Sequence, residues 1–134
     1  MNYHIRECRI EDAPAIYSLN RDEMRYEYPP EKTEKKLERL LRSDKDKILV
    51  AVDNDSVVGY IHACDYDVIY GPHMKNIMGI AVSGRHKRQG IGRTLLAEIE
   101  KWAEQTGAGG VRLCSGLTRT GAHEFYRHCG YYCS

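Results

Sequence analysis

Apolar residues recur along the chain with two spacings, which together predict an ordered series of strands and helices. Short apolar or alternating runs predict strands at residues 4–10, 48–52, 57–66, 76–82 and 111–114. Apolar residues at helical spacing predict helices at residues 13–24, 31–42, 94–106 and 119–129. Two helices therefore separate the first strand from a hairpin pair, after which strand, helix, strand and helix follow.

Residues with special backbone preferences fall between these segments. Asp12 and Pro14 suit a helix start, and Pro29 with Pro30 interrupts the helical pattern that precedes them. The unbroken apolar run at residues 48–52 is typical of a strand that is covered on both faces. This order predicts an α/β (α+β) fold with a mixed sheet, rather than a uniform doubly wound one.

Composition narrows the class of protein. The 134 residues contain no long polar or Pro/Gly/Ser-rich linker, so we expect one domain spanning residues 1–134. Twenty basic and 19 acidic side chains give a net charge of +1, which argues against a nucleic-acid duplex as partner. No apolar run approaches the roughly 20 residues that span a bilayer, and the N-terminus lacks the apolar core of a signal peptide. We therefore expect a cytoplasmic protein that does not contact a membrane.

The five cysteines form a scattered set without a Cys-x-x-Cys pair. This pattern favours reduced thiols over a disulfide framework or a zinc site, so we expect no metal.

The segment 77–107 carries the clearest chemistry. An apolar strand runs into a loop that combines Gly90 and Gly92 with four basic side chains, and the loop opens directly into a helix. Tight backbone turns and the N-terminus of a helix both present N–H groups, so the pattern predicts an anion site, with a plain basic helix-entry loop as the alternative. The dinucleotide motif would need a third glycine where Leu95 stands, and no Gly-Lys-Ser/Thr motif for a nucleotide triphosphate occurs. Nucleic-acid binding is disfavoured because no aromatic residues interleave the basic patch.

Two blocks of the sequence resemble the GNAT superfamily of N-acetyltransferases. Lys87-Arg88-Gln89-Gly90-Ile91-Gly92 is similar to the family motif Arg/Gln-x-x-Gly-x-Gly/Ala, with Lys87 in place of the usual Arg or Gln. The block from Ala122 to Tyr131 matches the family pattern Ala-x-x-Phe-Tyr-x-x-x-Gly-Tyr/Phe. The resemblance spans nearly the whole chain and implies a mixed, mostly antiparallel central sheet flanked by about four helices. It also implies a short C-terminal strand, which is either truncated or completed by a neighbouring chain in a homodimer.

The resemblance implies acetyl-CoA as cofactor, bound where strand 77–82 splays from strand 111–114, with a bulge at Gly79. Backbone groups of Ile80, Ala81 and Val82 would bind the pantetheine arm. The phosphate contacts implied by the family motif are Lys87, Arg88, Gln89, Gly90, Ile91, Gly92 and Arg93. Arg119 stands where many relatives carry a cofactor-binding Asn, and it could contact the cofactor or lie at the surface.

The implied reaction is attack of a neutral amine on the acetyl thioester within a ternary complex. The N–H group of Ile80 would polarise the thioester carbonyl, and Tyr126 would protonate the departing thiolate as general acid. Many relatives carry a Glu on the strand before the loop, but residues 74–82 contain no carboxylate. The candidate bases are Glu27, His62, Asp65, Asp67 and His73, and the sequence selects none of them.

The amine acceptor should contact the segment between the first two helices and the loop after the hairpin. Tyr26, Tyr28 and Tyr66 supply aromatic walls with polar tips, and nearby acidic residues would attract a cationic amine. This favours a primary amine of a small molecule or a peptide. The alternative is a non-catalytic acyl-CoA-binding or protein-interaction module, suggested by the missing carboxylate and the short C-terminus.

Overall fold

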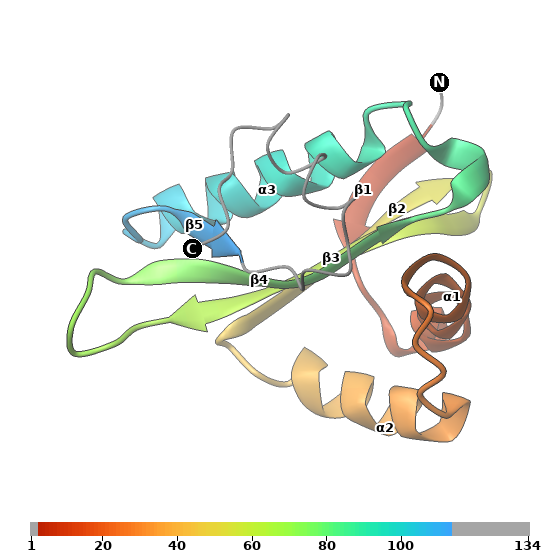
Figure 1. Cartoon of the computed structure of the whole chain (residues 1–134), viewed down its shortest axis with the longest axis horizontal. Helices are drawn as coiled ribbons and strands as arrows, with labels where there is room; N and C mark the ends of the chain where they lie inside the picture. The colour runs from red at the N-terminus through yellow and green to blue at the C-terminus, as the bar shows by residue number, and fades with distance from the viewer. Residues whose placement is uncertain (1–2, 114–134) are drawn as a thin grey trace.

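A five-stranded sheet with the order β1-β2-β3-β4-β5 forms the centre of the computed structural model, which describes residues 3–113 (Figure 1). The strands are β1 (Tyr3–Glu7), β2 (Asp46–Asp53), β3 (Ser56–Tyr66), β4 (Met74–Val82) and β5 (Val111–Leu113). Neighbouring strands are antiparallel except for β4 and β5, which run parallel. The predicted mixed, mostly antiparallel sheet is therefore confirmed. The helix expected at 119–129 and the C-terminal strand lie outside the described residues.

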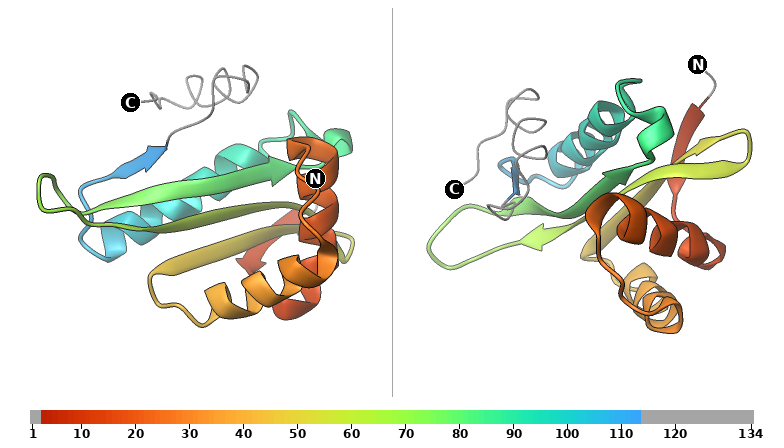
Figure 2. Two further views of the ribbon diagram at one scale, coloured as in Figure 1. Left: turned by 60° about the horizontal axis from the view of Figure 1, so that its bottom comes forward. Right: turned by 45° about the vertical axis from the view of Figure 1, so that its right-hand side comes forward.

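Three α-helices of the described residues cover the two faces of this sheet. They are α1 (Ala13–Leu19), α2 (Pro30–Leu41) and α3 (Ile91–Gln105), and the short turns η1 (Ile10–Asp12), η2 (Asn20–Met24) and η3 (Gly84–His86) accompany them. Helix α3 packs on one face, while α1 and α2 cover the other (Figures 1 and 2). The helix predicted at 13–24 is divided, because the chain widens into the π-helical turn η2 after Leu19.

The apolar core formed by residues 3–113 consists of two clusters, one on each face of the sheet. Leu49 and Ala51 of β2 pack toward α3, whereas Ile48, Val50 and Val52 pack toward α1 and α2. Alternate residues of a strand point to opposite faces, so a strand buried on both sides must be apolar throughout. This explains the unbroken apolar run at 48–52.

Left-handed backbone conformations mark the tight turns. Asn54 and Asp55 connect β2 to β3 with φ of 49° and 65°, the geometry that a two-residue hairpin requires and that Asn and Asp tolerate. Gly107 follows α3 with φ of 76°.

No helix within residues 3–113 combines the length and apolar character that a membrane crossing requires. Cys8 and Cys64 are free thiols, and burial raises the pKa of Cys8 to about 12.

Candidate functional site

Strand β4 contains one extra residue relative to its neighbour β3. His62 pairs with Gly79 and Ala63 pairs with Ile77, so Met78 has no counterpart on β3. Ile77 and Ile80 both pack on the α3 side although they are three residues apart. Side chains of a regular strand alternate with a period of two, so this spacing requires a β-bulge at Met78. The bulge lies one residue before the glycine at which it was expected.

The bulge changes the direction in which backbone groups of β4 point. The N–H of Lys75 donates to the carbonyl of Gly110 on the β5 side at 3.0 Å, whereas the N–H of Ser83 donates to Val58 of β3 at 2.8 Å. In a regular strand, two residues separated by an even number would face the same side. The bulge reverses this phase, so Ile80 and Val82 direct their N–H groups away from β3.

Within residues 3–113, these N–H groups lie on a part of the β4 edge that no strand pairs with. Among the described residues, β5 pairs only with Lys75, Asn76 and Ile77 of β4. Of the three predicted pantetheine contacts, Ile80 and Val82 therefore offer backbone donors to this edge. Ala81 does not. The carbonyl of Ala81 faces β3, where it lies 3.1 Å from the position that a Cβ on Gly59 would occupy.

Residues 83–93, the glycine loop, connect this edge to the N-terminus of α3. Arg88 and Gly90 adopt left-handed conformations with φ of 67° and 81°, and Gly90 is the N-cap of α3. The first helical hydrogen bond joins the N–H of Thr94 to the carbonyl of Gly90 at 2.9 Å. The N–H groups of the three residues between them have no acceptor within the helix, so they are available to an anion.

The end of β4 and the start of α3 are close in space. A Cβ on Gly59 would lie 3.4 Å from Cγ2 of both Val82 and Ile91. The structure thus brings the backbone donors of Ile80 and Val82 together with the predicted phosphate contacts at residues 87–93. The site combines a line of backbone donors with a helix N-terminus.

Positive charge surrounds the glycine loop. Arg85, Arg88 and Arg93 are exposed and form no ion pair with any residue in 3–113, whereas Gln89 is partly buried. Lys87 forms an ion pair with Glu23 at 3.1 Å between Nζ and Oε1. Glu23 also accepts a hydrogen bond from the N–H of Gly84 at 2.9 Å. Sequence reasoning missed this carboxylate, because no local pattern links it to a loop 61 residues later.

The predicted acceptor tyrosines lie in two separate places. Tyr26 and Tyr28 are exposed in residues 25–29, the acceptor segment, which follows η2. The Cε of Met24 lies 3.8 Å from the position of a Cβ on Gly79, so this segment begins beside the bulge. Tyr66 instead pairs with Met74, five residues from Gly79, or about 17 Å along the strand. There its hydroxyl lies 3.2 Å from that of Tyr70.

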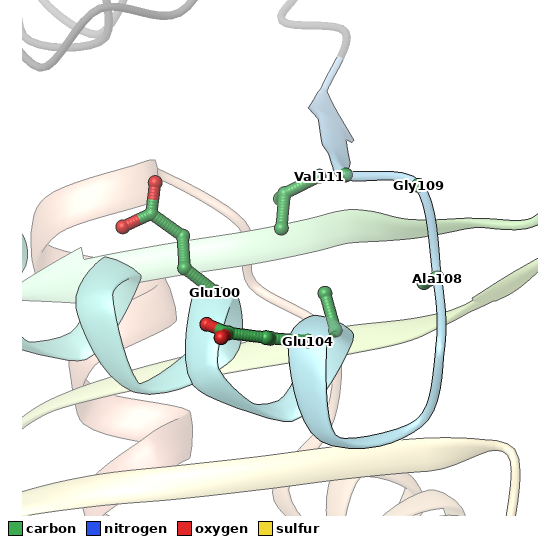
Figure 3. Close-up of a pocket in the computed structure, with 7 residues that line it drawn as sticks. Glu100, Glu104, Ala108, Gly109 and Val111 are labelled. Carbon is green, nitrogen blue, oxygen red and sulfur yellow. The ribbon is translucent and has the colours of Figure 1, made fainter.

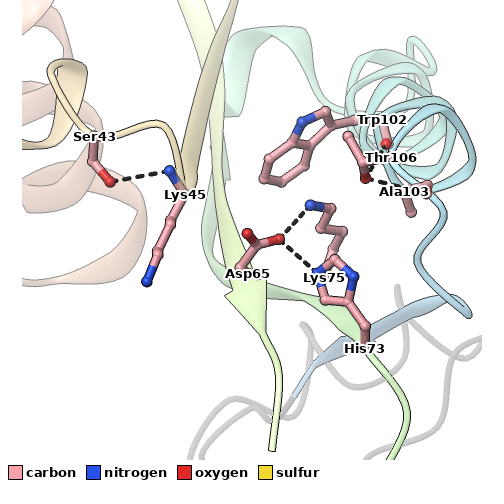
Figure 4. Close-up of polar contacts among 8 residues, drawn as sticks. All are labelled: Ser43, Lys45, Asp65, His73, Lys75, Trp102, Ala103 and Thr106. Atoms are coloured by element: carbon pink, nitrogen blue, oxygen red, sulfur yellow. Dashed lines mark hydrogen bonds and ion pairs between the residues drawn. The ribbon is translucent and has the colours of Figure 1, made fainter.

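Two of the candidate bases, His62 and His73, pair with carboxylates on opposite faces of the sheet. His62 Nε2 lies 2.7 Å from Asp46 Oδ1 on the face that α1 and α2 cover, directly across from Gly79. His73 Nε2 lies 2.9 Å from Asp65 Oδ1, and the same carboxylate accepts a hydrogen bond from Lys75 (Figure 4). That hydrogen bond from Lys75 holds the pKa of Asp65 below its usual range.

The remaining candidates differ in what the structure says of them. Glu27 and Asp67 are exposed. Tyr126 and Arg119 lie outside the described residues. The described part of the chain contains no group of three or more His, Cys, Asp or Glu side chains that could hold a metal ion.

A pocket of about 370 Å³ lies at the opposite end of α3 from the glycine loop (Figure 3). Glu100, Glu104 and Val111 contribute to its wall, together with the turn at residues 108–110. It contains none of the predicted site residues.

Comparisons with known proteins identify the family and the fold. The model of the Acetyltransferase (GNAT) family matches residues 13–131. None of the curated protein sequences compared with the chain matches it.

Several solved structures share the fold at low sequence identity. A transcriptional regulator from Bacillus halodurans C-125 is 21% identical with a TM-score of 0.87, covering 99% of this chain and 95% of its own. The aminoglycoside N-acetyltransferase AAC(6')-Iy, solved in complex with CoA, is 16% identical with a TM-score of 0.87, covering 98% and 88%. A possible acetyltransferase from Clostridium difficile 630 is 23% identical with a TM-score of 0.81, covering 100% and 93%. The family model covers most of the chain and the fold agrees with it, so the protein belongs to the GNAT acetyltransferase family.

Proposed function

We propose that this protein is an N-acetyltransferase that transfers an acetyl group from acetyl-CoA to a primary amine of a small molecule or peptide, by direct attack in a ternary complex. The observation that carries the proposal is the bulge at Met78. It sets the N–H groups of Ile80 and Val82 on the side of β4 away from β3, along an edge that is unpaired in the described part of the chain and leads directly to the N-terminus of α3. The thioester arm of acetyl-CoA would need donors along the strand edge, and its diphosphate would need donors at the helix N-terminus.

The residues of the site suit this cofactor. A Cβ on Gly90 would meet no atom of the described residues within 4 Å, so the helix N-cap itself is not crowded by residues 3–113. N–H groups of residues 91–93 and the exposed Arg88 would bind the diphosphate. Backbone groups of Val82 and Ile80 would hold the pantetheine arm along the edge of β4. Arg119 stands where many relatives carry a cofactor-binding Asn, so we propose it as a further contact to the cofactor.

Acetyl-CoA supplies the activated acetyl thioester, and the protein supplies the groups around it. The N–H of Ile80 donates to the carbonyl oxygen, where negative charge develops as the amine attacks. Tyr126 gives its phenolic proton to the departing thiolate. Tyr26 and Tyr28 orient the amine from the acceptor segment, and Tyr66 would contact only an acceptor that extends along the sheet.

The amine must lose a proton, and His62 is the best placed of the five candidate bases. It lies across from Gly79 on the face where the acceptor segment begins. Asp46 contacts its Nε2, so Nδ1 is left to accept a proton through water. Asp65 and His73 are engaged with Lys75 on the other face of the sheet, toward Trp102.

Thermal unfolding with and without ligand tests the cofactor, because a ligand that binds only the native state raises Tm. Acetyl-CoA should raise Tm in proportion to the logarithm of its concentration, and release of free thiol on addition of amines should follow. The AAC(6')-Iy complex makes aminoglycosides a reasonable first set of amines. No change in Tm at millimolar acetyl-CoA would refute the function. Binding without thiol release across a broad amine panel would instead support the non-catalytic acyl-CoA-binding module.

A further inference from the structure

Glu23 lies in η2, just before the acceptor segment, and its side chain contacts the glycine loop. One carboxylate oxygen, Oε2, accepts a hydrogen bond from the N–H of Gly84 at 2.9 Å, and the other, Oε1, pairs with Nζ of Lys87 at 3.1 Å. The Glu23 side chain is 18% exposed, whereas that of Lys87 is 59% exposed. The carboxylate is therefore held in place, while the ammonium group has room to move.

The backbone that carries Glu23 is fixed on the sheet. The hydroxyl of Tyr60 donates to the side chain of Asn20 at the start of η2. Met24 at the end of η2 reaches Gly79, and the N–H of Tyr26 donates to the carbonyl of Asn20 at 2.9 Å. The acceptor segment thus starts two residues after a side chain that contacts the glycine loop directly.

The charges at the loop place Glu23 in competition with an anionic ligand. Arg85, Arg88 and Arg93 form no ion pair in the described part of the chain, and Asp53 contacts the loop only through His86, at 3.2 Å. Glu23 is the carboxylate that contacts Lys87. A diphosphate bound at the N-terminus of α3 would attract the same ammonium group and would be repelled by this carboxylate.

We propose that Glu23 is a positioning residue that couples the cofactor site to the acceptor segment through an exchange of partners at Lys87. In the free protein, Glu23 holds both Gly84 and Lys87. When the cofactor binds, Lys87 moves to the diphosphate and Glu23 keeps only Gly84, which loosens the turn before the acceptor segment. The inference rests on the proposed function, and it adds the link between the two substrate sites.

Calorimetric titration with coenzyme A tests the competition. Glu23→Gln keeps an oxygen for the N–H of Gly84 but removes the charge, so it should tighten the Kd for coenzyme A about two- to fivefold, the effect expected of an exposed ion pair. Asp22→Asn is the matched control, because it removes the neighbouring charge, which pairs with Arg21 instead of the loop. It should leave the Kd unchanged. Lys87→Met should weaken binding, and more strongly in the Glu23→Gln background.

Hydrogen exchange tests the coupling. In the wild-type protein, saturating coenzyme A should speed exchange of the amides of residues 20–26 severalfold. In Glu23→Gln these amides should exchange at the faster rate already and should not respond to coenzyme A. Unchanged or slowed exchange in the wild type, or a weaker Kd in Glu23→Gln, would overturn the inference. Failure of the wild type to bind coenzyme A at all would instead refute the proposed function.

Discussion

The ammonium group of Lys75 lies 3.8 Å from the centroid of the Trp102 ring, on the α3 side of the sheet (Figure 4). Lys75 is 2% exposed, and its charge is balanced by the carboxylate of Asp65, which His73 also contacts. A buried cation can thus be accommodated at the start of β4 because an aromatic face and a carboxylate both stabilise it.

Asp65→Asn should destabilise the protein far more than Lys75→Met. The first change leaves a buried ammonium group without its counter-ion, which costs about 3 kcal/mol. The second replaces the ion by an apolar chain of similar length and should cost less than about 1 kcal/mol, because the Asp65 side chain is partly exposed and keeps His73. Urea unfolding of both variants measures the difference. Equal losses of unfolding free energy would show that the unpaired charge of Lys75 is not what destabilises Asp65→Asn.

Asp12 should contribute to acid unfolding. Burial raises its pKa, but hydrogen bonds from Arg6 and from the N–H of Arg9 outweigh this effect and leave the pKa below its ordinary value. Asp12 therefore binds a proton more readily in the unfolded chain than in the folded protein. The stability from this group is fully present above about pH 4 and is lost as the pH falls through the folded pKa.

Unfolding free energies measured from pH 6 to pH 3 check this expectation. Asp12→Asn should be less stable than the wild type at pH 6, and the gap should narrow below pH 4. Asp44→Asn is the control, because this exposed residue has no ion pair within residues 3–113. A gap that stays constant with pH would contradict the assignment.

Gly90→Ala should lower stability by about 1 kcal/mol, because a Cβ disfavours a left-handed backbone. The cost should be conformational, since none of the neighbouring atoms in residues 3–113 lies within 4 Å of the new Cβ position. Gly90→Asn should lose less, because Asn adopts this conformation more readily. Thermal unfolding ranks the three proteins, and the Kd for coenzyme A should weaken in the same order. A larger loss for Asn than for Ala would point to steric contact instead of backbone strain.

His62→Asn should lower kcat by about 100-fold if His62 removes the proton from the amine, with the Kd for coenzyme A unchanged. His73→Asn is the matched control, since it removes the same side chain from the pair on the opposite face. It should change stability rather than turnover. Equal kcat values for the two variants would remove His62 from the mechanism.

Tyr126→Phe should lower kcat by about 100-fold while leaving coenzyme A binding intact, because it deletes only the proposed proton donor. Binding is measured by calorimetry and turnover by thiol release. An unchanged kcat would mean that another donor protonates the thiolate.

Periodicity predicted the elements well, and the reason is visible at β2 and α3. Both faces of β2 are buried, and Leu95, Leu96 and Ile99 of α3 line one face of the helix, so apolar spacing reports structure directly. Lys75 is the instructive failure. The strand was predicted to begin at residue 76, just after this lysine, but β4 begins at Met74, because Trp102 and Asp65 allow the lysine to be buried.

The candidate site could be assembled from the sequence only where its residues follow one another in the chain. The glycine loop runs directly from strand to helix, so residues 87–93 could be grouped as one predicted anion site. The partners that reach the site through tertiary contacts could not be, because Glu23 is 61 residues from Gly84 and Asp46 meets His62 only through the register of β2 and β3. The direction of the N–H groups of β4 likewise depends on how β4 pairs with β3, which the spacing of apolar residues does not predict.

The bulge at Met78 makes the chain sensitive to length at this point, independently of which residue stands there. Deleting position 78 would leave a regular ladder in which Gly79 still pairs with His62 and Ile80 with Ile61, so the donors and side chains of Ile80 and Val82 would keep their directions. The deletion would remove the local bend and added twist of β4 directly after Ile77, the last residue of β4 that pairs with β5 in the described part of the chain. A substitution at Met78 would keep this geometry, because its side chain is largely exposed. Related chains should therefore tolerate many residues at this position, whereas a gap there would straighten β4 where it parts from β5.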